Sequence, residues 1–118
     1  MRDYDPVYAR LREIMLAAAE DLPVTRDGPG ELVVRTHAID PKTREPGWFG
    51  MVAIKKSYVS YHLIPLYDHP ALAADLGAAL EKRRQGKTCF NFKATDAGAF
   101  DELACLTRAV RQVLGAVG

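Results

Sequence analysis

Three segments with the composition of β-strands follow one another between residues 31 and 64, and the connections between them are short. They cover residues 31–39, 48–55 and 58 to about 64, and each is rich in β-branched or aromatic residues. Neighbouring strands joined by short connections pair antiparallel, because a parallel crossover needs a dozen or more residues. This succession constrains the fold of the 118-residue chain more than any other feature.

The segments before these strands indicate a helix and a turn. Asp5-Pro6 is typical of a helix start, and apolar residues then recur at helical spacing as far as Leu22, before Pro23. A strong turn signal follows at residues 27–30. The connection at residues 56–57 has no glycine, so the second and third strands could also form one long bent strand.

The second half of the chain predicts two more helices around a fourth strand. One helix is expected after His69-Pro70, with Gly86 just beyond its end. The strand follows at residues 87–93, and Thr95 or Asp96 caps the final helix. The predicted fold class is α+β, with a mostly antiparallel β-sheet of about four to five strands and helices packed on one face. The order of its elements is α-β-β-β-α-β-α.

Size and charge restrict the function classes. The length suits a single domain, residues 1–118, and sixteen basic against fifteen acidic residues make a nucleic-acid partner unlikely. No apolar run has the roughly 20 residues of a membrane span, and no signal peptide is recognisable, so no membrane partner and a cytoplasmic location are expected. Cys89 and Cys105 form no CxxC pair and are predicted to be buried free thiols.

Basic, aromatic and imidazole groups gather on the third strand and near the fourth. Between residues 81 and 93 there are five cations and one acid, and this basic and aromatic patch predicts a site for a small anionic ligand or a protein partner. In this hypothesis Lys56 and Lys87 hold the anion, while Tyr61 and His62 orient it. The candidate ligand-binding residues are Lys55, Lys56, Tyr58, Tyr61, His62, Lys87 and Asn91.

Other functions remain open at this point. Strand alternation groups His62 with Tyr58 and Ser60, so His62 could serve as the acid or base of an enzyme or an accessory subunit. A homodimer that joins sheet edges or apolar faces is a third hypothesis. The three histidines lack a compact ligand spacing, so no metal is predicted, and no cofactor. The segment QGKT lacks the first glycine of a phosphate-binding loop, because Glu81 occupies that position.

Three stretches carry a family resemblance: GWFGMV at residues 47–52, KSYVSYHLIPLY at residues 56–67 and QGKTCFNFK at residues 85–93. In this order the chain resembles small bacterial proteins of the YdhG-like domain of unknown function family, over roughly residues 47–114. The resemblance implies an α+β fold with an antiparallel sheet, and no agreed activity. Some relatives have been likened to frataxin, so the resemblance also offers iron binding as an alternative. This alternative is weaker, because the first helix and strand offer few carboxylates.

Overall fold

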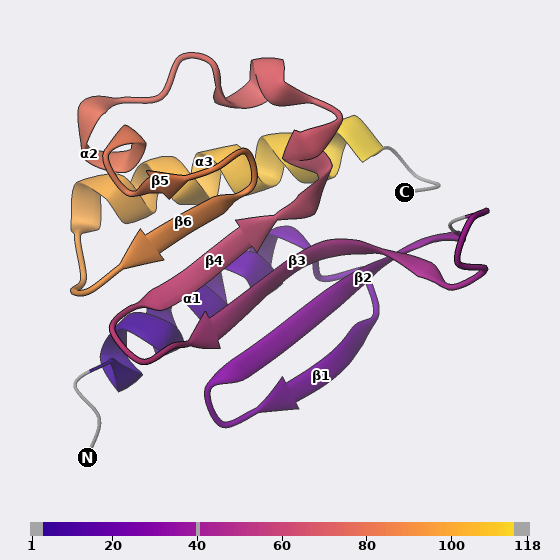
Figure 1. Ribbon diagram of the computed structural model, residues 1–118, viewed down its shortest axis with the longest axis horizontal. Coiled ribbons are helices and arrows are strands. Elements are labelled where there is room, and N and C mark those ends of the chain that lie inside the picture. Colours follow the sequence, from indigo (N-terminus) through magenta and orange to yellow (C-terminus); the bar gives the residue numbers. More distant parts are fainter. Residues whose placement is uncertain (1–3, 40, 115–118) are drawn as a thin grey trace.

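In the part of the chain that the structure describes, all six strands of the sheet pair antiparallel with their neighbours, as the short connections between the central strands predict (Figure 1). The computed structural model describes residues 4–39 and 41–114, and in this part of the chain the strand order is β1-β2-β3-β4-β6-β5. The strands are β1 (Val24–Gly28), β2 (Glu31–Ile39), β3 (Pro46–Ile54), β4 (Val59–Leu63), β5 (Arg84–Gln85) and β6 (Cys89–Phe92). The predicted α+β class with an antiparallel sheet is therefore confirmed.

Two long helices, α1 (Asp5–Ala18) and α3 (Ala97–Leu114), lie on one face of this sheet (Figure 1). Asp96 caps α3, because its side chain accepts a hydrogen bond from the amide of Ala99 at 3.2 Å. The helices and the sheet enclose the core, which burial of apolar side chains stabilises. Its largest fully buried side chains include Tyr61, Phe49, Phe90, Phe92, Leu11, Met15, Leu32 and Leu103.

The two edge strands, β1 and β5, were not predicted. β1 is polar and mostly exposed, so the apolar alternation that marks a half-buried strand is missing there. Tertiary contacts hold it instead: Arg12 forms an ion pair with Asp27 at 2.5 Å, and the Tyr8 hydroxyl donates to the carbonyl of Gly28 at 3.3 Å. The predicted turn becomes the β1–β2 hairpin, with Gly30 at φ +78°.

The second predicted helix is broken into three short pieces. They are the 3₁₀ turns η1 (Ile64–Tyr67) and η2 (Pro70–Ala73) and the one-turn helix α2 (Ala78–Glu81). Gly77 precedes α2 in an extended conformation, and its amide donates to a carboxylate oxygen of Glu102 on α3 at 2.6 Å. Gly86 therefore does not end a long helix. It has φ +81° in the turn between β5 and β6.

The connection between β3 and β4 is a tight turn, so the alternative of one long bent strand is wrong. The amide of Lys55 donates to the carbonyl of Tyr58 at 2.7 Å and closes this turn. β4 then runs back along β3 through five residue pairs, from Ile54–Val59 to Gly50–Leu63.

Both cysteines are free thiols, but their predicted burial is only partly right. Cys89 is half-buried in β6, whereas Cys105 is exposed on α3. The buried positions of α3 include 99, 100, 103, 106, 107 and 110, and residue 105 lies outside this stripe. Within the described ranges, no helix is long and apolar enough to cross a membrane.

Candidate functional site

The side chains of β4 alternate between the core and the face of the sheet that α1 and α3 leave uncovered. Val59, Tyr61 and Leu63 are fully buried in the core. Ser60 and His62 therefore point to the other face, where His62 is half-buried. Ser60 is also buried, and its hydroxyl lies 3.4 Å from the carbonyl oxygen of Ala53.

The strand register brings residues from three strands beside these two side chains. His62 lies between Met51 of β3 and Cys89 of β6. Ser60 pairs with Asn91 of β6. Directly opposite residues of an antiparallel pair share a face of the sheet, so these side chains form adjacent rows on the uncovered face.

Arg83 continues the row of Ser60 and Asn91, because its carbonyl accepts the amide of Asn91 at 2.8 Å just before β5 begins. Lys55 follows the last residue of β3 in the β3–β4 turn, and its charge acts on both His62 and Cys89. We name this group of side chains the uncovered-face cluster. Its members are Lys55, Ser60, His62, Arg83, Cys89 and Asn91.

The cations of the uncovered-face cluster have no acidic partner. Among residues 4–39 and 41–114, neither Lys55 nor Arg83 forms an ion pair, and the Nε atom of Arg83 is buried without a hydrogen-bond acceptor. Glu31 of β2 lies in the same row as Ser60, because both residues pair with Ala53 of β3. Its carboxylate forms an ion pair with Arg26 at 2.6 Å. A buried guanidinium nitrogen without an acceptor is costly.

Burial and charge act on the two titratable groups at the centre of the cluster. Burial, followed by the charge of Lys55, lowers the pKa of His62 below its ordinary value of 6.5. Burial raises the pKa of the Cys89 thiol, and the charge of Lys55 offsets only part of this rise. The thiol donates to the side-chain oxygen of Asn91 at 3.3 Å. At neutral pH the imidazole is therefore uncharged and the thiol protonated, which is the reverse of an activated cysteine–histidine pair.

The structure brings together three of the seven predicted ligand-binding residues, Lys55, His62 and Asn91. Lys56 and Tyr58 lie in or beside the β3–β4 turn at one end of β4. Tyr61 points away from the uncovered face, into the core, where its hydroxyl is 2.7 Å from that of Thr107. It therefore does not orient a ligand at this surface.

Lys87 lies at the opposite end of β4 from Lys56. The carbonyl of the next residue, Thr88, accepts the amide of Leu63, and the Lys87 ammonium is 4.9 Å from the centre of the Tyr67 ring. β4 has five residues, and strands rise about 3.3 Å per residue, so the two lysines flank a strand about 16 Å long. The hypothesis that they hold one small anion between them does not fit this separation.

Three members of the cluster are not among the seven predicted residues: Ser60, Cys89 and the cation Arg83. The predicted long helix placed it in a last turn, where a cation complements the helix dipole. Because that helix is broken, the residue stands beside β6 instead. A signal was present in the neighbouring Gly77 and Gly86, since two glycines nine residues apart favour a short element between them.

In the described part of the chain, no group of three or more His, Cys, Asp or Glu side chains could hold a metal ion. Comparison of the chain with protein-family models, with curated proteins and with solved structures gives no match. The resemblance to the YdhG-like family therefore stays a prediction.

Proposed function

We propose that this protein binds a small anionic ligand on the uncovered face of its sheet, without catalysing a reaction on it. The observation that carries this proposal is the buried Nε of Arg83, which has no acceptor among the described residues, beside Asn91 on the face that His62 shares. Arginine and lysine next to neutral donors are the groups that recognise phosphate and carboxylate. A protein partner that presents such a group would use the same contacts.

Asn91 supplies a neutral donor to the proposed site. Its side-chain oxygen accepts the Cys89 thiol, which directs the amide NH₂ group away from that thiol. An anion above Asn91 would receive hydrogen bonds from this amide and from the Arg83 guanidinium, with Lys55 adding charge from the β3–β4 turn. The expected ligand is compact and carries phosphate or carboxylate oxygens.

The protonation states support binding over covalent catalysis. A nucleophilic cysteine needs a lowered pKa, and burial moves the pKa of Cys89 in the other direction. His62 is an uncharged base at neutral pH, which keeps a role in acid–base catalysis as the second candidate function. The second candidate requires turnover of a bound molecule, whereas the first requires only its reversible binding.

Replacing Arg83 by glutamine is expected to weaken binding of inorganic pyrophosphate about tenfold or more. The reason is that a hydrogen bond to a charged group contributes about 1.5–3 kcal/mol. Lys55→Gln is expected to have a smaller effect, because this exposed lysine acts mainly through screened charge. Backbone amide shifts in NMR titrations measure both affinities and show whether the shifts map to residues 60, 62, 89 and 91.

Lys87→Gln is the matched control for these variants, because it removes the same charge at the other end of β4. The proposal predicts that its affinity for pyrophosphate stays within about twofold of the unmodified protein. If all three variants weaken binding equally, the protein attracts anions by net charge alone and the uncovered-face cluster is not a site.

Binding of an anion is also expected to tighten as the pH falls below about 6.5. The folded pKa of His62 is lowered, so its imidazole becomes charged only below that value, and a bound anion then stabilises the imidazolium. Sulfate is the suitable probe, because it stays a dianion between about pH 5 and 8, the range in which histidine titrates. Sulfate affinity of the protein and of His62→Gln, followed by NMR against pH, checks this.

In the protein without a bound anion, the lowered pKa of His62 decreases the free energy of unfolding at low pH. The contribution of His62 is fully present above its unfolded pKa and is lost as the pH falls through the lower folded pKa. Sulfate should raise the midpoint of the His62 ring titration. A midpoint that does not move when sulfate saturates the protein would place the anion away from His62.

A further inference from the structure

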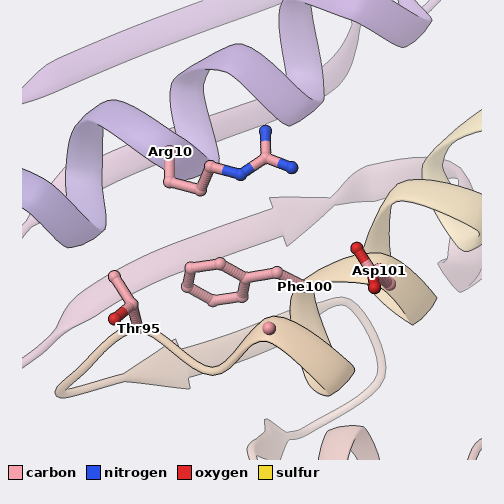
Figure 2. A pocket seen from close by; sticks show the side chains of 5 residues that line it. Arg10, Thr95, Phe100 and Asp101 are labelled. Atoms are coloured by element: carbon pink, nitrogen blue, oxygen red, sulfur yellow. The ribbon is translucent and has the colours of Figure 1, made fainter.

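A second site candidate lies on the helix-covered side of the molecule, between α1 and the start of α3. It is a pocket of about 260 Å³, open to solvent, and Figure 2 shows Arg10 on one wall and the Phe100 ring between Thr95 and Asp101 on the other. Its lining residues are Arg10, Thr95, Ala97, Phe100 and Asp101. None of them belongs to the uncovered-face cluster, so the two sites are independent.

Charges of both signs face this pocket from different elements. Arg10 extends from α1, and its only ion pair in the described ranges is a loose one with Glu13 at 3.8 Å, one helical turn away. Asp101 lies in the first turns of α3 and forms no ion pair with a described residue. The two groups line one opening without pairing with each other. A free anion would be repelled by Asp101, and a free cation by Arg10.

The floor of the pocket is apolar. Phe100 is only 2% exposed and packs edge-on against Phe92, with ring centres 5.0 Å apart. Ala97 adds a methyl group beside it. Pockets for drug-sized ligands enclose about 300–1,000 Å³, so this smaller space suits a molecule of amino-acid size.

From these observations we infer that the pocket binds a small zwitterion with a short apolar body, such as a free aliphatic amino acid. Its carboxylate pairs with the Arg10 guanidinium, and its ammonium group pairs with the Asp101 carboxylate. Its side chain rests on Phe100 and Ala97. The affinity is expected to be on the order of 1 mM, because the pocket is open and its charged groups are solvated.

Three probes of similar shape separate the two charge contacts. L-Valine carries both charges, isovalerate lacks the ammonium group, and valinamide lacks the carboxylate. The protein is expected to bind L-valine about two- to fivefold more tightly than either of the others, as reported by the amide shifts of residues 97, 100 and 101 in NMR titrations. Equal binding of the three probes, or no shift at these amides with L-valine, would overturn the inference.

Two variants assign each contact to its residue. Arg10→Gln is expected to remove the preference for L-valine over valinamide, and Asp101→Asn the preference over isovalerate. Arg108→Gln and Asp75→Asn are the matched controls, because both residues are exposed and lie outside the pocket lining. A control variant that loses the same preference would show that the probes do not bind in this pocket.

The dipeptide Val-Gly tests whether the ligand is a free amino acid or the start of a peptide. Binding of Val-Gly equal to that of valinamide supports a free amino acid. Binding of Val-Gly tighter than that of L-valine would overturn the inference of a free amino acid.

Discussion

Replacing Tyr61 by alanine is expected to lower the free energy of unfolding by about 3–5 kcal/mol. The side chain is completely buried in the core, so its removal leaves a large cavity. The hydroxyl of Thr107 also loses its hydrogen bond with the Tyr61 hydroxyl. Small domains have a total stability of about 5–15 kcal/mol, so the loss is a large part of it. Urea denaturation followed by circular dichroism measures the change.

Tyr61→Phe is the matched variant for this prediction. It keeps the ring and loses one hydrogen bond, and Thr107 still donates to the carbonyl of Leu103 at 2.7 Å. The expected loss is about 1 kcal/mol. Because Tyr61 points away from the uncovered face, Tyr61→Phe should bind pyrophosphate as the unmodified protein does. A stable Tyr61→Ala variant, or weaker binding by Tyr61→Phe, would contradict the position of this side chain in the core.

Gly50→Ala is expected to destabilise the protein by about 1–3 kcal/mol through overpacking. A methyl group there would lie 2.5 Å from the Met15 side-chain methyl and 2.6 Å from the carbonyl oxygen of His62. The end of Met15 can move, but the backbone of His62 is held in the ladder between β3 and β4. The strands must therefore shift, and the loss of stability is again measured by urea denaturation.

Gly28→Ala tests whether the destabilisation by Gly50→Ala comes from the steric contacts at residue 50 or from replacing a glycine as such. A methyl group at Gly28 would meet no atom within 4 Å, and the residue does not have a positive φ. Its replacement is expected to leave stability unchanged or to raise it by about 0.4–1 kcal/mol. Equal destabilisation by both variants would show that Gly50 does not allow the close approach of α1 to the sheet.

Most of the central fold was predictable from local patterns. β-Branched and aromatic segments mark β2, β3 and β4, and the alternation in β4 separates Tyr61 and Leu63 from Ser60 and His62. The edge strand β1 was not predictable in this way, because its polar residues have no alternation and an ion pair with α1 holds them. The single helix expected after Pro70 does not form, for a related reason. Its apolar spacing is genuine, but Gly77 and contacts with α3 favour short turns.

The residues of the candidate site also fall into those that local sequence patterns predict and those that depend on tertiary contacts. His62, Lys55 and Asn91 could be proposed from the sequence, because strand alternation and residue chemistry are local properties. The separation of Lys56 from Lys87 and the arrival of Arg83 beside Asn91 depend on strand order and register. These depend on which residues meet across the sheet, and contacts between distant segments leave no periodic signal in either segment.

The sequence by itself determined the fold class, the antiparallel pairing of the central strands and the two faces of β4, because each follows from short connections and side-chain periodicity. Only the tertiary structure decided that Tyr61 belongs to the core, that Arg83 stands beside Asn91, and that Arg10 and Asp101 line one pocket. The physical reason is that burial and charge pairing are properties of neighbours in space, and folding brings these neighbours together from far apart in the chain.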